Sequence, residues 1–387
     1  MNFSLPSKGY VFWPVGNGDS TTIVVDEGET VMQVDLHHTS SSDEDDDSRS
    51  PVVDRLEECL PEDENGDPYL AVFALTHPHT DHIKGFEELL DRIEVGEIWH
   101  TPRIFHEYHK DLGDDASAFK REVKRRREKT IENEGDVESG DRVRVIGHDD
   151  VFDEEYEGFP EQWKTYPGND ISALDGNDYS DTFEAFVHAP FKDDSAGERN
   201  ETSLALQVKL SDGSEVGKAL LLGDLTYPTV KRIFDKTKEK DRPERLEWDI
   251  FLAPHHCSKS VMYWRSGDDE EDELKQELLD EFEDASLPPA HVVASAKSDF
   301  TDADGDNPPH RKARRRYEEI VRDFICTHEH PSEDDPEPIK LEFTDDGFRH
   351  VDPEEATEEE GADLSDAVES ARGTDAPPKD EVGFGNE

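Results

Sequence analysis

Cysteine is scarce in this sequence, and long apolar runs are missing. The 387 residues include 3 cysteines, Cys59, Cys257 and Cys326, which are too few and too widely spaced for a disulfide framework or a cysteine-based zinc finger. No run of about 18 apolar residues occurs, and the N-terminal MNFSLPSKGYVFW lacks the charged-then-apolar layout of a secretion signal. We therefore expect a soluble protein of a reducing, cytoplasmic compartment, with no membrane association.

Basic residues are also few relative to acidic ones. The chain has 42 Lys and Arg against 98 Asp and Glu, so its net charge is -56 on a hydrophobic fraction of only 32%. Such a surface suits either a polyanionic mimic of nucleic acid or a protein of a high-salt cytoplasm, where salt screens the repulsion between carboxylates. We favour the high-salt interpretation because segments typical of regular structure alternate with acidic loops. It predicts that stability increases with KCl up to molar concentrations.

The apolar pattern predicts strands that alternate with helices. We expect a hairpin from 21–25 and 31–36, a short helix around 51–60, a buried strand at 71–75 and a helix around 82–93. Later strands are expected at 182–189, 203–210, 219–224, 249–254, 287–296 and 339–343, with a helix at 313–324. The organisation is one layered α/β domain over 1–351, with an insertion at 101–180 made of a helix at 116–134 and a long acidic loop, and a disordered acidic tail at 352–387.

The stretch LTHPHTDHIKG follows the buried strand at 71–75 directly. It places His77, His79, Asp81 and His82 within six positions. Imidazole and carboxylate groups are ligands for zinc, manganese and iron, and their alternation along an extended turn can direct several of them at one centre. This density of ligand types after a buried strand favours a metal site over a histidine-rich surface turn.

Further candidate ligands stand at the ends of later strands. The segment ALLLGDLT places Asp224 after an apolar run, and DIFLAPHHCSKS places His255 and His256 after another. Taken singly, a Gly-Asp pair after a strand is as consistent with a turn as with a ligand. Following the histidine-rich stretch in this order, Asp224 and His256 are predicted to complete its metal site.

The pattern H-x-H-x-D-H after an apolar strand resembles the signature of the metallo-β-lactamase fold. The resemblance implies a four-layer αββα sandwich with a one- or two-metal site at one edge. In that family the aspartate matching Asp224 bridges two metals and the histidine matching His256 is a ligand, which leaves His255 on the substrate side or in an orienting role. The implied cofactor is one or two divalent cations, with zinc favoured and manganese as the alternative.

A narrower resemblance extends over about 8–348. The segments PVGNGDSTTIVV, NETSLALQV, PHHCSKS and SAKSDF…NPPH are similar to motifs of the ComEC-type branch, named for the hydrolase domain of the DNA-uptake competence protein. The membrane channel that accompanies that domain is not found in this sequence. We therefore expect a stand-alone relative.

The sequence departs from the family pattern at several positions. A third histidine ligand of the first metal is replaced in register by Asn200, and His188 is the nearest alternative. Cys257 stands where glycine is usual, and its thiol is either a ligand or, as we favour, a small buried side chain. His310 matches a family position near the site and is equally consistent with a loop histidine at a helix start.

The ligand set favours hydrolysis by a metal-activated hydroxide, with Asp81 or Asp224 holding it and a site histidine available for proton transfer. Asp81 and His255 are the candidate catalytic residues. The first hypothesis is hydrolysis of a phosphodiester, such as single-stranded DNA or a nucleotide. A small ester or lactone is the second substrate class, and an inactive interaction protein with this fold is the alternative from another class.

Two basic runs stand out against the acidic background, FKREVKRRREK at 119–129 and HRKARRR at 310–316. They could line a path for a phosphate backbone, or they could form ion pairs with the abundant carboxylates. The sequence leaves both interpretations open, together with the natural substrate and the oligomeric state.

Overall fold

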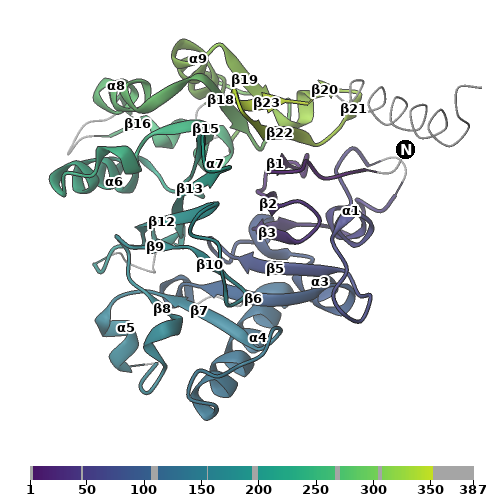
Figure 1. The fold of residues 1–387 in the computed structure, drawn as a ribbon. Coiled ribbons are helices and arrows are strands. Elements are labelled where there is room, and N and C mark those ends of the chain that lie inside the picture. The colour runs from purple at the N-terminus through teal and green to yellow at the C-terminus, as the bar shows by residue number, and fades with distance from the viewer. Residues whose placement is uncertain are drawn as a thin grey trace, which may run out of the picture. The chain divides into compact units, whose positions relative to one another are not determined.

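The computed structural model describes residues 3–44, 47–105, 112–154, 156–193, 199–265, 271–303 and 307–351. The tail predicted to be disordered at 352–387 lies outside the described residues. The described chain forms two large β-sheets with helices on their outer faces (Figure 1).

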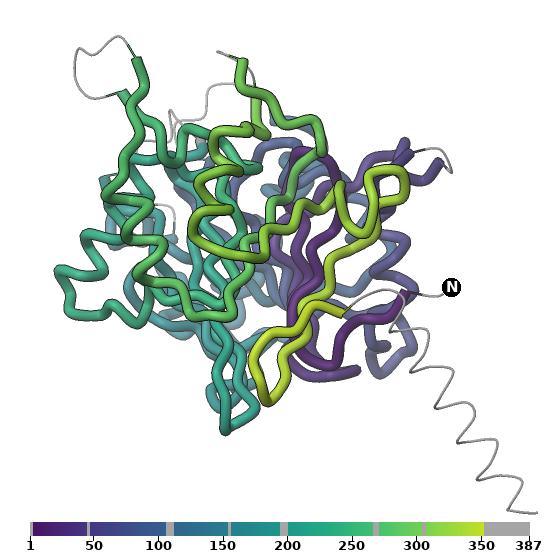
Figure 2. Tube along the Cα trace, turned by 90° about the horizontal axis from the view of Figure 1, so that it is seen from above, coloured from purple at the N-terminus to yellow at the C-terminus, as the bar shows by residue number. Residues whose placement is uncertain are grey.

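The first sheet has nine strands, and its centre runs parallel. Its order is β23 (Gly347–His350), β22 (Ile339–Thr344), β1 (Gly9–Phe12), β2 (Thr21–Asp26), β3 (Thr30–Val34), β5 (Tyr69–Ala74), β6 (Glu94–His100), β7 (Arg142–Ile146) and β8 (Lys164–Thr165). The strands β3, β5, β6, β7 and β8 are parallel to one another. The strand β22, which comes just before the last strand β23, pairs with β1, so the two ends of this unit lie side by side (Figure 2).

The second sheet has seven strands and is also parallel over half its width. Its order is β19 (Asp323–Cys326), β18 (Ser286–Ala294), β15 (Trp248–Leu252), β14 (Val216–Leu221), β13 (Ala205–Ser211), β12 (Phe183–Ala189) and β9 (Asp170–Ile171). The strands β14, β15, β18 and β19 are parallel to one another. The hairpin at β2–β3 and the strands predicted at 182–189, 203–210 and 249–254 are thus confirmed within a few residues.

The apolar side chains form clusters that define four layers. One cluster fills the space between the sheets and includes Val72 of the first sheet and Ile250 of the second. A second lies under the helices of the first sheet, α1 (Val52–Cys59), α3 (Phe86–Arg92) and α4 (Asp114–Glu132), and a third under α6 (Tyr227–Glu239), α8 (Gln276–Ala285) and α9 (Arg311–Ile320). The predicted αββα sandwich is confirmed, because each sheet buries one face on the other sheet and one face on helices.

The segment predicted as an insertion, 101–180, contributes to these same layers. The predicted helix is α4, which buries Ala116, Phe119 and Val123 at helical spacing against the first sheet. The prediction of a long loop behind this helix is wrong, because β7, α5 (Asp149–Glu154), β8 and β9 form there. The alternating sequence RVRVI of β7 was too short to be recognised as a strand among acidic residues, and it forms a strand because it pairs with β6.

None of the helices in the described ranges is long and apolar enough to cross a membrane.

The parallel arrangement determines where polar side chains gather. The strands β3, β5 and β6 of the first sheet and β14, β15 and β18 of the second end in residues that lie near one edge of the sandwich. Carboxyl ends of parallel strands share an edge, so loops that are distant in sequence meet there. The residues that follow β5, β14 and β15 are the predicted ligands.

The buried, neutral His188 is expected to make the fold less stable in acid. His188 on β12 bonds through Nε2 to the Arg245 carbonyl oxygen at 2.9 Å, and burial lowers its pKa from 6.5 to about 4. The unfolded chain therefore binds an additional proton between these values, so this contribution to stability is complete above pH 6.5 and is lost as the pH falls toward 4. The expected size is on the order of 3 kcal/mol.

Chemical denaturation at fixed KCl between pH 7 and pH 4 measures this effect. The variant His188→Gln keeps a donor for the Arg245 carbonyl oxygen but cannot titrate. Its free energy of unfolding is expected to fall less steeply over this range than that of the unchanged protein. Equal slopes for the two proteins would contradict the assignment.

Candidate metal centre

The predicted ligands come from both sheets. His77 and His79 lie on the loop after β5, and Asp81 and His82 lie in the short helix α2 (Thr80–Ile83). Asp224 follows β14, and the pair at 255–256 follows β15 in the short segment α7 (Pro254–Cys257).

One group of possible ligands contains Asp19, His82, Asp224 and His256, whose ligand atoms lie within 4.8 Å of one another. His82 Nε2 is 3.3 Å from Asp224 Oδ1 and 3.3 Å from His256 Nε2. His256 Nε2 is 3.4 Å from the same Asp224 oxygen, and its Nδ1 is 3.4 Å from Asp19 Oδ1. All four residues are buried.

A second group contains His77, His79 and again Asp224. His77 Nε2 lies 3.1 Å from His79 Nδ1 and 3.6 Å from Asp224 Oδ2. Asp224 thus directs Oδ1 toward one group and Oδ2 toward the other. This sharing is the geometry required of a carboxylate that bridges two cations.

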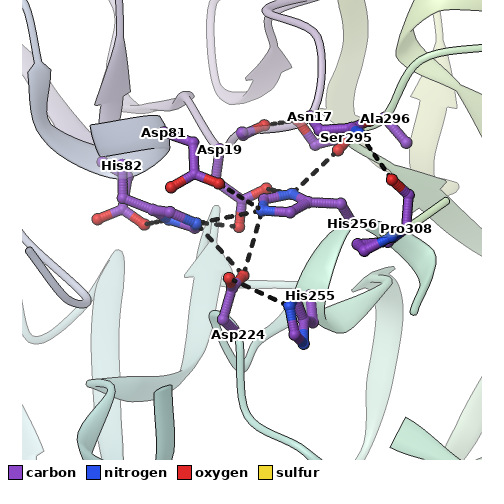
Figure 3. Close-up of polar contacts among 12 residues, drawn as sticks. Asn17, Asp19, Asp81, His82, Asp224, His255, His256, Ser295, Ala296 and Pro308 are labelled. Carbon is purple, nitrogen blue, oxygen red and sulfur yellow. Dashed lines mark hydrogen bonds and ion pairs between the residues drawn. The ribbon is translucent and has the colours of Figure 1, made fainter. Parts of the chain in front are cut away.

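Two further predicted residues lie at the margin of the cluster (Figure 3). Asp81 Oδ2 is 3.5 Å from His256 Nε2, and its side chain is 35% exposed. His255 Nε2 is 3.8 Å from Asp224 Oδ2, with 22% of its side chain exposed. These residues are therefore the ones that a molecule entering from solvent can reach.

The histidine pair after β15 is held by an unusual backbone. His255, His256 and Cys257 have φ values of 51°, 53° and 61°, so three consecutive residues other than glycine adopt the left-handed conformation. His255 N–H donates to the Gly223 carbonyl oxygen at 3.1 Å, which ties this turn to the residue before Asp224. Left-handed conformations cost free energy outside glycine and are concentrated at functional sites. The turn directs the two histidines to different sides of the cluster.

Asp35, at the end of β3, supports the cluster from behind. Its Oδ2 accepts from His82 Nδ1 at 2.7 Å and from the Thr76 hydroxyl at 2.5 Å, and its Oδ1 accepts from Thr76 N–H at 2.7 Å. A carboxylate bound to one imidazole nitrogen fixes the ring so that the other nitrogen faces the ligand site. Asp35 was not predicted as a site residue, because the sequence VDL at the end of a strand is equally typical of an ordinary turn.

Asp19 is the other residue that the sequence analysis missed. It lies in the GNGDS loop between β1 and β2, where Asp19 N–H donates to the Asp81 carbonyl oxygen at 3.1 Å. A Cβ on Gly18 would lie 2.6 Å from the same Asp81 oxygen and from His37 Nδ1, so only glycine permits this approach. Ser295 Oγ donates to the Gly18 carbonyl oxygen at 2.5 Å and fixes the loop from the second sheet. The position of Asp19 directly after this glycine was the sequence feature that could have indicated a site residue.

Electrostatics in the cluster are strongly coupled. Burial by itself would raise the pKa of Asp224, but the attraction of His256 and His82 outweighs it and holds the pKa well below its usual range. Burial alone would lower the pKa of both histidines, yet Asp224 and the neighbouring carboxylates raise both well above the ordinary value. Protons on these imidazoles balance the buried carboxylates. A divalent cation supplies the same positive charge, so its binding is expected to release protons.

The residues present fit a divalent cation. Asp19 Oδ1 and Asp224 Oδ1 are buried and accept no hydrogen bond from the residues that the structure describes. Buried oxygens without a hydrogen bond are costly, whereas oxygen and imidazole ligands in this arrangement suit zinc or manganese. The first group could hold one cation, and the second group, with the shared Asp224, could hold another.

The two alternatives for the remaining ligand differ in position. Both ring nitrogens of His188 have other partners, since Nε2 bonds to the Arg245 carbonyl oxygen and Nδ1 lies 3.4 Å from the Thr237 hydroxyl. His188 is therefore outside the cluster. Asn200 lies in η3 (Arg199–Thr202), and Leu204 N–H just beyond it donates to the Thr76 carbonyl oxygen at 3.0 Å. This bond places the Asn200 segment beside the loop that carries His77.

Cys257 and His310 have structural surroundings. The thiol of Cys257 is fully buried in the apolar cluster under the helices of the second sheet, and burial raises its pKa well above the usual value. A protonated thiol is a poor ligand, which agrees with the small-side-chain interpretation. His310 Nδ1 accepts from Lys259 N–H at 3.2 Å, and the backbone N–H of His310 donates to the Cys257 carbonyl oxygen at 3.1 Å. His310 thus holds the segment that carries the histidine pair.

Comparison with known families agrees with this geometry. Residues 57–169 match the family model of the metallo-beta-lactamase superfamily. The matched segment includes His77, His79, Asp81 and His82, and it ends before Asp224. The chain therefore contains a metallo-beta-lactamase superfamily domain, with the mixed α/β fold of that superfamily, whose members are generally metal-dependent hydrolases.

Similar solved structures have low sequence identity. The metallo-beta-lactamase fold protein YhfI from Bacillus subtilis is 12% identical, with 82% of this chain and 95% of that chain covered and a TM-score of 0.37. BJP-1, a subclass B3 metallo-beta-lactamase of Bradyrhizobium japonicum, is 13% identical, with coverages of 65% and 79% and a TM-score of 0.30. No curated protein matches the chain significantly.

Proposed function

We propose that this protein is a metal-dependent phosphodiesterase of the ComEC-type branch, with zinc as the favoured metal and manganese as the alternative. The observation that carries the metal-dependent part is the position of Asp224 between two groups of ligands, with one carboxylate oxygen toward each. Two divalent cations bound there would lower the pKa of a shared water and polarise the oxygens of a phosphoryl or acyl centre.

The protein's own residues divide the work of binding and positioning. The buried His77, His82 and His256 and the part-exposed His79 would hold the cations, with Asp224 between them. Asn200 is proposed as a weak further ligand on the His77 side. Asp19 adds a buried carboxylate to the His82 side, which the sequence analysis did not include. The solvent side is left to Asp81 and His255.

His255 is proposed to move a proton during the reaction. Its ring is part-exposed, and Nδ1 lies 3.5 Å from the Ser260 hydroxyl while Nε2 faces Asp224. This position lets the imidazole exchange a proton between the reacting group and solvent. Asp81, at the same exposed margin, is proposed to orient the attacking water by accepting a hydrogen bond from it.

The phosphodiester assignment rests on the family resemblance and on the two ligand groups that share Asp224, because two cations held there would suit in-line displacement at phosphorus. The basic runs add less support for a long nucleic acid. In 119–129, Arg125 and Lys129 pair with Asp141, and in 310–316, Arg314 pairs with Glu318 and Glu329. Contact with nucleic acid through 119–129 and 310–316 therefore remains a proposal of its own. Hydrolysis of a small ester or lactone is the second candidate.

A parallel substrate assay tests the proposal. The purified protein is incubated with zinc or manganese and with bis-p-nitrophenyl phosphate, single-stranded DNA or a lactone. Molar KCl is used because we also propose adaptation to high salt, from the 98 acidic against 42 basic residues. Bound metal is measured on the same samples, and chelator-treated protein is the control.

Each outcome selects one function. Metal-dependent turnover of bis-p-nitrophenyl phosphate is expected, and turnover of single-stranded DNA in addition would support a nuclease. Turnover of the lactone alone would replace the proposal by the ester candidate. If no metal binds and Asp81→Ala changes neither turnover nor stability, the protein is an interaction protein that retains the fold.

A further inference from the structure

A cavity of about 140 Å³ lies between the first sheet and α4, outside the metal centre. It is lined by one stripe of α4, by the end of β6 with the following turn η1 (Pro102–Phe105), and by Tyr156. None of the candidate metal ligands contributes to its wall. The neighbourhood of α4, β6 and α5 can be followed in Figure 1.

The charged part of the wall is entirely cationic. Lys120, Lys124 and Arg127 line the cavity at helical spacing, and among the residues described no acidic side chain lines it. This is unusual in a chain with 98 acidic and 42 basic residues. Lys120 forms no ion pair within the described part of the chain and lies over the Phe105 ring at 5.5 Å, and Lys124 has only a distant contact of 3.8 Å with Glu128.

Other cations of the same helix behave differently. Arg121 pairs with Glu87 at 3.1 Å, and Arg126 donates to the Val95 and Gly96 carbonyl oxygens. The ion-pair interpretation of this basic run therefore accounts for much of the helix but not for Lys120 and Lys124, which face the cavity. Lys120 and Lys124 therefore concentrate positive charge at the cavity and have capacity to bind an anion, and Arg127 adds its charge beside them.

His100 supplies a polar group at the wall of the cavity. Its side chain is only 4% exposed, and its buried Nδ1 has no hydrogen-bond partner among the described residues. Burial, followed by the nearby Arg127 and Lys120, lowers the pKa of His100 to about 3, so the ring is neutral. A buried imidazole without a partner is costly, and a core position of this kind would be better filled by phenylalanine. Within the described part of the chain nothing satisfies this nitrogen, so it is available to a bound ligand.

The remaining walls are apolar or aromatic. Phe105, Tyr156, Pro102 and Val123 line the cavity, and the Arg127 guanidinium lies over the Tyr156 ring at 5.4 Å. A volume of about 140 Å³ is close to that of a cavity known to admit benzene. Space for one ring, aromatic walls and a cationic rim together describe a specific ligand class.

We propose that this cavity binds a small aromatic anion, with a single ring between Phe105 and Tyr156 and a carboxylate or phosphonate group at Lys120, Lys124 and Arg127. His100 hydrogen-bonds to the ligand from the wall. The site is separate from the metal centre and does not depend on the proposed hydrolase activity.

Ligand-observed NMR titration of the full-length protein at constant KCl tests the site. The probes are benzoate and phenylphosphonate, with benzyl alcohol as a neutral molecule of the same ring and inorganic phosphate as an anion without a ring. Benzoate and phenylphosphonate are expected to bind more tightly than either control. The expected effect of Lys120→Gln is weakening of benzoate binding by roughly fivefold, the size of one screened charge interaction at contact.

Two further variants separate a binding site from a structural role. Arg121→Gln removes a charge from the same exposed helix outside the cavity and is expected to leave benzoate affinity unchanged. His100→Phe is expected to abolish binding and to raise the melting temperature. Equal affinity for benzyl alcohol and benzoate, equal weakening by Lys120→Gln and Arg121→Gln, tighter binding of phosphate than of benzoate, or no binding at all would overturn the proposal.

Discussion

Replacement of Asp224 by asparagine is expected to remove at least one equivalent of bound metal and to reduce phosphodiester turnover by about 10³-fold or more. The reason is geometric, because Asp224 Oδ1 faces His82 and His256 while Oδ2 faces His77. An amide has one weak oxygen ligand and no charge, so it can neither bridge two cations nor balance them. Elemental analysis of the purified variant and a rate measurement with bis-p-nitrophenyl phosphate check the two parts separately.

The matched control for this experiment is Asp249→Asn. Asp249 lies on β15 of the same sheet, accepts from Lys218 N–H at 2.7 Å, and has its pKa raised to about 6 by burial. It is not part of either ligand group. Metal content and turnover should stay unchanged in this variant. Full metal content and full turnover in Asp224→Asn would reduce Asp224 to a turn residue after β14.

Replacement of Asp35 by asparagine is expected to weaken metal binding by roughly 10- to 100-fold without touching the metal. The carboxylate is 1% exposed and accepts from His82 and twice from Thr76. Asparagine tolerates the left-handed backbone at this position, where φ is 56°, so the substitution isolates the hydrogen bonds. One amide oxygen cannot accept all three bonds, so the His82 ring loses its fixed orientation. Competition with a chelator of known affinity measures the effect.

Asp175→Asn provides the comparison for Asp35. Asp175 is also buried and left-handed, with φ of 44°, and it accepts from Tyr69 and Ser139 hydroxyls and from Arg142 away from the ligand groups. Both substitutions should lower the free energy of unfolding. Only the Asp35 variant should lose metal affinity, and equal loss in both would show that Asp35 acts through general stability.

The layered fold was largely predictable because its signals are local. Apolar runs such as DIFLAP and SLALQVKL belong to strands buried on both faces, and the amphipathic pattern of α4 is complete within its own sequence. The strands β6 and β7 were not predicted. Their sequences, EVGEIWH and RVRVI, contain charged residues that are neutralised only by tertiary contacts, such as the buried pair of Glu97 and Arg144 at 2.8 Å.

The candidate metal centre was predictable to the extent that its ligands are adjacent in sequence or follow recognisable strand ends. The signals at Asp19 and Asp35 were weaker, because a GDS turn and a strand-ending VDL are common in loops without ligands. Asp35 contributes only because the end of β3 lies beside that of β5, and Asp19 because the Gly18 backbone approaches Asp81 closely.

By itself, the sequence determined a layered α/β domain, a chain of high negative charge and a compact set of candidate metal ligands after a buried strand. Only the tertiary structure decided that Asp224 is shared by two candidate ligand groups, that His188 is outside them and that three cations of α4 line one side of a cavity. The physical reason is that ligand types and periodicity are local properties of a chain. Which atoms meet depends on parallel strands from two sheets ending at one edge, and no local pattern encodes those distances.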